Sequence, residues 1–345
     1  MLKRRWWWRP ALPSLLCALL AACLISPARV TAQEKPPLAR ATPLFDFHSN
    51  FWVNLQQVLF HEAKLRAGKP DRGLQSATAL SAAGMSAEDE TEWNAAVNFY
   101  AAHFGARQQF GPLGDDQLIE INDDLATQPD DGSQLNPAGL SPQIVAVLRS
   151  AAVIYRRYWW PAHQKSNENW IASQQERVQD LGPELAAAMT KDLHQQWPAA
   201  PIRVDVCYEV AALGHALTTL SPAHTTFSSS DPTNQGLSGF ELLFHESSHT
   251  FADTMMTALA AEGRTQHKDV GDLWHSVLFY TSGVELRRVL PAPEQAGFTP
   301  YAYRYGVYRG RWRTYRPLLE THWQAYLDGK TGFTAAIHSM VAGLP

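Results

Sequence analysis

Two histidines lie four residues apart inside an apolar pattern of helical spacing, in the stretch His245-Glu246-Ser247-Ser248-His249. An α-helix turns by about 100° per residue, so the two imidazoles share one face and lie roughly 6 Å apart along the axis. The surrounding apolar positions recur at steps of three and four residues: Phe240, Leu243, Phe244, Phe251, Met255 and Leu259. This pattern predicts a helix that ends near Gly263, with the apolar stripe facing a core and the two histidines on another face with Asp253.

Two imidazoles on one helical face can bind one metal ion. Zn²⁺ in a hydrolytic site takes three protein ligands and keeps a fourth position for water, whose pKa falls to about 7. Glu246 is then placed to accept a proton from that water. The pentapeptide resembles the HExxH signature of the zincin metallopeptidases, over about residues 200–290. The resemblance implies Zn²⁺ bound by His245 and His249, with Glu246 as the general base that drives peptide-bond hydrolysis.

The third metal ligand must come from outside the pentapeptide. The extended metzincin pattern requires Gly at position 252 and His at position 255, whereas the chain has Ala252 and Met255. A second helix is predicted over residues 269–290, and it carries two candidates, His275 and Glu285. Asp253 is interpreted as a supporting or solvent-facing carboxylate and not as a ligand.

His275 and Glu285 cannot both complete the site, because ten helical residues separate them by about 15 Å along the axis and about 80° around it. We favour His275 for two reasons. It lies near the start of the helix, similar to where gluzincin families place their glutamate, and the bulky residues 273–274 just before it are expected to bury it. A tight antiparallel hairpin would instead bring Glu285 level with His249. Glu285 also has a structural explanation, because Arg288 lies one turn further on. The NExxSD pattern of gluzincins is absent.

The first 32 residues predict a secretory signal peptide. A basic start is followed by an apolar run over residues 11–25 and by a cleavage region that ends at Ala32. The run is shorter than the roughly 20 residues of a spanning helix. As an alternative, residues 20–23 resemble a bacterial lipobox, which would make Cys23 a lipid anchor. Cleavage after Ala32 is favoured, and either route predicts an extracytoplasmic protein, periplasmic or secreted.

Composition excludes several other classes of protein. A net charge of −4 over 345 residues gives no support for nucleic-acid binding. With Cys17 and Cys23 in the signal peptide, only Cys207 remains, so no intramolecular disulfide is expected, and Cys207 is interpreted as a buried residue that ends a strand. The chain lacks GxSxG, P-loop and GxGxxG motifs, and no later stretch is apolar enough to span a membrane.

The chain after the signal peptide is divided into two regions. Residues 33–198 form a mainly helical region, with helices predicted over 51–65, 87–104, 142–158 and 161–197, the last interrupted near 182–183. The Asp pairs of residues 111–137 are interpreted as helix caps and solvated turns. His48 and His61 are interpreted as structural.

Residues 199–345 form the predicted zincin-like region that binds the metal. Alternating or Thr-rich stretches predict strands over 202–206, 217–220 and 225–229. Strands directly before the motif helix are similar to the zincin arrangement, in which a small sheet covers the cleft and its edge strand pairs with an extended substrate. The expected fold is therefore α+β and predominantly α-helical, with a small sheet packed on the HExxH helix.

Tyrosines and arginines are concentrated between residues 301 and 316. A phenol or guanidinium from this segment could stabilise the oxyanion formed when water attacks a carbonyl. For any single residue, a packed aromatic surface with solvated arginines is the favoured interpretation.

The sequence as a whole predicts an extracytoplasmic zinc peptidase that acts on peptides or proteins. Two alternatives from other classes are an extracytoplasmic zinc-binding protein without catalysis and a helical envelope-binding protein that holds no metal.

Overall fold

The structure is a computed structural model that describes residues 43–68, 84–108, 116–211, 216–220, 223–310 and 312–345. The predicted signal peptide, the lipobox and nearly all of the chain up to the first strand lie outside the described residues. Residues 42–345 form one compact unit. Within the part that is described, no helix combines the length and the hydropathy that crossing a bilayer requires.

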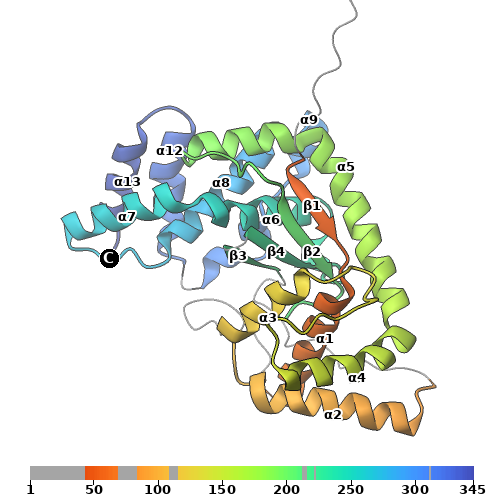
Figure 1. Ribbon diagram of the computed structural model, residues 1–345. Helices are drawn as coiled ribbons and strands as arrows, with labels where there is room; N and C mark the ends of the chain where they lie inside the picture. The colour runs from red at the N-terminus through yellow and green to blue at the C-terminus, as the bar shows by residue number, and fades with distance from the viewer. Residues whose placement is uncertain (1–42, 69–83, 109–115, 212–215, 221–222, 311) are drawn as a thin grey trace, which may run out of the picture. The chain divides into compact units, whose positions relative to one another are not determined.

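A four-stranded mixed sheet lies at the centre of the fold (Figure 1). Its strands are β1 (Phe45–His48), β2 (Ile202–Cys207), β3 (Ala216–Leu220) and β4 (Ala223–Ser228). The spatial order is β1-β2-β4-β3; β1, β2 and β4 run parallel, and β3 is an antiparallel edge strand. Because β1 pairs with β2, the predicted N-terminal and C-terminal regions share one sheet.

Helices account for most of the remaining described chain, so the fold is α+β and mainly helical, as expected. Before β2 they are α1 (Phe51–Arg66), α2 (Ala87–Phe104), α3 (Asp116–Ala126), α4 (Pro142–Tyr158) and α5 (Trp160–Asp192). After the sheet they are α6 (Gly236–Ser248), α7 (Asp253–Gln266), α8 (Leu273–Val289), α9 (Ala292–Gly297), α10 (Tyr301–Arg304), α11 (Tyr315–Leu318), α12 (Gln324–Leu327) and α13 (Phe333–Ala342).

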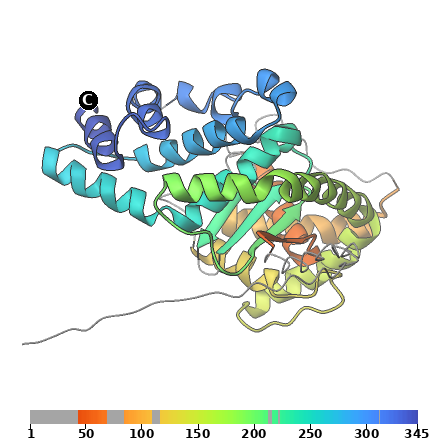
Figure 2. The same cartoon turned by 90° about the horizontal axis from the view of Figure 1, so that it is seen from above.

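The sheet separates two hydrophobic cores, because successive strand residues point to opposite faces. Val204, Ala216 and Phe227 pack into the core formed with α6, α8 and the second half of α5. Cys207 and Leu217 pack into the other core, formed with the N-terminal helices. Figure 2 shows these N-terminal helices, orange to yellow, and the blue C-terminal helices on opposite sides of the sheet.

Several predicted elements are confirmed with bounds close to the expected ones. The helices α2 and α4 cover the predicted ranges, and each begins after a serine whose hydroxyl accepts a backbone N–H, Ser86 from Asp89 and Ser141 from Ile144. The three predicted strands are present, and Cys207 is buried at the end of β2 as expected.

Other expectations about the N-terminal region are wrong. The helix α5 continues through Pro183 without interruption, and β1 was not expected. The segment interpreted as caps and turns contains α3, whose Leu118, Ile121 and Leu125 are buried at helical spacing. Two of its aspartates form ion pairs with histidines, Asp123 with His224 and Asp130 with His48.

The motif helix is shorter than predicted. The helix α6 ends at Ser248, a 3₁₀ turn follows over His249–Phe251, and α7 is a separate helix that continues to Gln266. Gly263 therefore does not end the helix. A Cβ at position 263 would lie 2.7 Å from a methyl carbon of Val270, so glycine allows close packing there. The predicted apolar stripe is buried as expected.

Close packing of α8 against α6 brings the two halves of the candidate site together. At Gly283 in α8, a Cβ would lie 2.6 Å from Pro300 and 2.9 Å from the buried carboxyl of Glu241 in α6. The chain just before α6 is held by Trp170 of α5, whose indole N–H donates to the carbonyl of Asn234 at 2.7 Å. These contacts fix α6 against both α5 and α8.

A buried ionic network joins α3 to the sheet. The Nδ1 atom of His224 lies 3.0 Å from Asp123, and its Nε2 atom lies 2.8 Å from Asp205, which also pairs with Arg203. Burial alone would lower the pKa of His224, but the two carboxylates outweigh it and raise the pKa to about 9. Burial likewise disfavours ionised Asp205, yet His224 and Arg203 lower its pKa below the usual value.

We expect the His224→Gln variant to lose more stability, relative to the wild type, at pH 6 than at pH 8. The folded-state pKa of about 9 exceeds the ordinary 6.5, so the stabilisation is complete below about pH 6.5 and is lost as the pH rises through 9. Between pH 6 and pH 8 the difference in free energy of unfolding should shrink by about 2 kcal/mol. Chemical denaturation of both proteins measures this difference, and an equal value at both pH values would contradict a charged His224.

Candidate metal centre

The helix α6 supplies two of the three histidines at the candidate metal centre. His245 is fully buried in the last turn of α6, and His249 follows where the helix gives way to the 3₁₀ turn. The backbone of His249 keeps helical dihedrals, with φ of −59° and ψ of −30°. The spacing of one turn is therefore preserved despite the early end of the helix, and the two ring centroids lie 5.1 Å apart.

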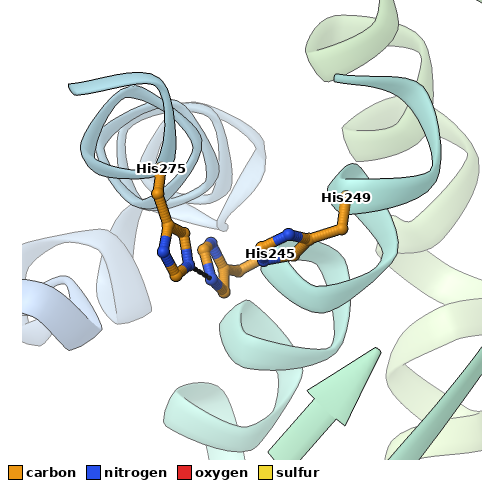
Figure 3. A group of neighbouring side chains, drawn as sticks. All are labelled: His245, His249 and His275. Atoms are coloured by element: carbon orange, nitrogen blue, oxygen red, sulfur yellow. Dashed lines mark hydrogen bonds between the residues drawn. The ribbon is translucent and has the colours of Figure 1, made fainter. Parts of the chain in front are cut away.

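The third histidine is His275, in the first turn of α8. Its Nε2 atom lies 3.1 Å from Nε2 of His245, and its ring centroid lies 4.7 Å from that of His249. One nitrogen from each of the three rings falls within 4.8 Å of the others. Figure 3 shows the three rings converging, two from α6 and its end and one from α8.

These separations suit a shared metal ion. Two nitrogens bound to one tetrahedral zinc at about 2.0–2.1 Å lie about 3.3 Å apart, close to the 3.1 Å between His245 and His275. His245 is buried, whereas His249 and His275 each keep part of their surface exposed. The centre is therefore nearest to solvent on the side of His249 and His275.

Two of the histidines, His245 and His249, are in the protonation state that metal binding requires. Burial lowers the pKa of His245 well below its usual value, and its two histidine neighbours act in the same direction. Burial lowers the pKa of His249 to about 4. Both imidazoles are consequently neutral near pH 7, with lone pairs available to a metal.

His245 has one buried nitrogen that the described residues leave unsatisfied. Its Nδ1 atom has no hydrogen-bond partner among them, while Nε2 faces His275. An orphaned buried polar atom costs about 1–3 kcal/mol. Within the described part of the chain, the polar contact that the ring makes is directed at the centre, as expected for a metal ligand.

Aromatic side chains hold the three imidazoles in place. The ring of Phe279 stacks on His245 with a centroid distance of 3.4 Å. Trp274 packs against both His249 and His275, and Trp312 meets His275 edge to face at 4.9 Å. Because apolar rings surround the centre, an ion held there would be poorly screened by water.

Glu285, the alternative third ligand, lies away from the three histidines and is engaged elsewhere. Its carboxylate pairs with Arg288 at 2.5 Å and also bonds Asp192 of α5. Burial raises the pKa of Glu285 to about 7, with Asp192 adding to the rise and Arg288 opposing it. The described residues that gather as possible metal ligands include His275 and not Glu285. Asp253 is exposed at the start of α7, consistent with a solvent-facing carboxylate.

Glu246 is 9% exposed and directly follows the buried His245. The hydroxyl of Thr218 in β3 donates to its Oε2 atom at 2.7 Å. Burial raises the pKa of Glu246 to about 7, and the bond from Thr218 opposes the rise. Sequence reasoning missed Thr218, because its relation to Glu246 depends on how the strand packs against α6.

Tyr301 is the phenol of the segment 301–316 whose pKa is affected by the charge of Glu246. The hydroxyl of Tyr301 is 3.2 Å from the Thr233 hydroxyl, and its backbone N–H donates to buried Glu241 at 2.6 Å. Burial raises the pKa of Tyr301, and the charges of Asp231 and Glu246 act in the same direction.

Other tyrosines of the same segment bond elsewhere: Tyr303 to Glu320, Tyr305 to Ser238 and Tyr308 to the carbonyl of Ser276.

The chain was compared with protein-family models, with curated proteins and with solved structures. None of the three comparisons gave a match. The function of the centre therefore has to be argued from its own geometry.

Proposed function

We propose that the protein is a zinc-dependent peptidase of the HExxH type. The observation that carries the proposal is the convergence of His245, His249 and His275, with Glu246 directly beside them in the sequence. His245, His249 and His275 would hold the zinc ion, which would supply a Lewis acid that activates water and polarises a carbonyl. Three histidines, without a carboxylate in the group, are a ligand set that zinc commonly takes.

The residues around the centre have distinct parts in the proposed reaction. Glu246 accepts the proton of the attacking water and later delivers it to the leaving amine, and a pKa near 7 suits both transfers. Tyr301 donates a hydrogen bond to the oxygen on which negative charge develops. Phe279 and Trp312 limit the access of bulk water to the reacting groups.

The arrangement of the sheet supports the proposal that residues 199–345 form a zincin-like region. The antiparallel edge strand β3 lies beside α6 and touches Glu246 through Thr218. An extended peptide that paired with this edge would run past the centre. The proposed substrates are therefore peptides or proteins, and the proposed location, carried by residues 1–32, is periplasmic or secreted.

Removing the third ligand should weaken metal binding strongly. We expect the purified wild type to hold about one zinc per chain, and His275→Ala to weaken zinc affinity by more than about 100-fold, because a ligand matters more than its supporting partners. Glu285→Ala is the matched control and should keep its zinc. Metal analysis after dialysis measures both. Retention by the first variant and loss by the second would assign the ligand to Glu285, and a zinc-free wild type would rule out the proposal.

Glu246→Gln separates an enzyme from a protein that only binds zinc. The amide cannot accept a proton, so kcat should fall by about 10²- to 10⁴-fold, while the zinc content remains that of the wild type. Cleavage of a fluorogenic peptide library, with chelator inhibition and zinc restoration as controls, gives the rates. Wild-type protein that holds zinc but cleaves no peptide would indicate binding without catalysis.

Tyr301→Phe should reduce kcat by about 10²- to 10³-fold with little change in KM, since the lost hydrogen bond forms only in the transition state. The matched control is Tyr305→Phe, which removes an exposed hydroxyl from the same segment. Equal rates for the two variants would contradict a role for Tyr301.

A further inference from the structure

Thr218 connects the edge strand to the proposed general base. Its hydroxyl lies 2.7 Å from Oε2 of Glu246 and 3.0 Å from the backbone carbonyl of the same residue. Thr218 lies in the middle of β3, on the strand face that points toward α6, as does Ala216 two residues before it. The hydroxyl can therefore donate its hydrogen bond to the backbone carbonyl at the end of α6, to the carboxylate of Glu246, or to both.

The carboxylate is the preferred acceptor. A hydroxyl has one proton to donate, and the Glu246 carbonyl already accepts the backbone N–H of His249. The carboxylate oxygen is the nearer acceptor, and a bond to an ionised oxygen is the stronger one. The described residues donate no other hydrogen bond to this carboxylate, so Thr218 fixes Oε2 and leaves Oε1 available.

We propose that Thr218 is a positioning residue, which orients the Glu246 carboxylate so that Oε1 faces the substrate water. This inference rests on the proposed function. Thr218 touches neither metal nor substrate and acts only through Glu246.

The strand that carries Thr218 is itself anchored from the N-terminal region. The neighbouring residue, Thr219, points to the opposite face and donates to Asp123 of α3 at 3.1 Å. Asp123 also binds His224, the residue that pairs with Thr219 across β3 and β4. The helix α3 and its ionic network thereby fix the position of β3, which assigns the N-terminal helices a part in shaping the site.

The test compares Thr218→Val, which removes the donor at equal size, with Thr218→Ser, which keeps it. We expect the valine variant to retain zinc and to lose about 10- to 100-fold in kcat with little change in KM, and the serine variant to stay near the wild type. Thr225→Val is the matched control. Thr225 is buried on the same face of the adjacent strand, directly opposite Thr218, and bonds the carbonyl of Arg203.

A binding measurement makes the test independent of turnover. Acetohydroxamic acid chelates zinc and donates a hydrogen bond to a carboxylate beside it, so its Kd should rise about 10-fold in Thr218→Val and in Glu246→Gln. If the wild type cleaves no peptide, the proposed function fails, while this comparison still decides whether the carboxylate is positioned.

Unchanged kcat and unchanged hydroxamate affinity in Thr218→Val would overturn the inference. Loss of zinc in both Thr218→Val and Thr218→Ala would also overturn it, because the hydroxyl would then support the fold of α6 and not the orientation of Glu246. A wild type without zinc would overturn both the inference and the proposed function.

Discussion

The contact between α6 and α8 is the interaction on which the candidate centre depends. Any helix can carry two histidines one turn apart, but a third ligand must come from another element. That element has to place the ligand level with the two histidines along the axis of α6. Gly283 removes the side chain that would separate the two helices. The stacking of Phe279 on His245 then fixes the position of α8 along α6, and with it the position of His275 in the first turn of α8.

The protein tolerates unfavourable burial at this place. Three imidazoles lie together, one ring nitrogen of His245 has no hydrogen-bond partner among the described residues, and the burial of Glu246 raises its pKa. Groups with shifted pKa values that gather in one place are more typical of functional sites than of structural packing. A core designed only for stability would fill the same volume with aliphatic side chains at lower cost.

Much of the fold could be predicted from local chemistry. Serine caps together with helical periodicity predicted α2 and α4, and the alternation of apolar and polar residues predicted β2. The break after Ser248 was hidden because a short 3₁₀ turn preserves the approximate phase of the apolar stripe. The helix α3 was hidden because its aspartates, read as turn residues, are in part paired with a distant histidine.

The candidate site was predictable where sequence spacing determines geometry and unpredictable where packing does. The spacing of His245 and His249 follows from the helix itself. The choice between His275 and Glu285 depends on how α8 returns to α6. A tight hairpin would have favoured Glu285, but the predicted motif helix breaks after Ser248, and α7 is a separate helix between α6 and α8. Thr218 could be related to Glu246 only once the strand register was known, because a shift of one residue would turn it to the opposite face.

The early end of α6 has a consequence for the length of the chain between the ligands. The helix α7 carries none of the three gathered histidines and packs mainly on α13 at the edge of the fold. A change in length between Ala252 and Asp272 should therefore spare the three ligands as long as the buried Met255 and Leu259 keep their places in the core and α8 keeps its packing on α6. The ligand geometry therefore does not fix the number of residues that separate the pentapeptide from His275.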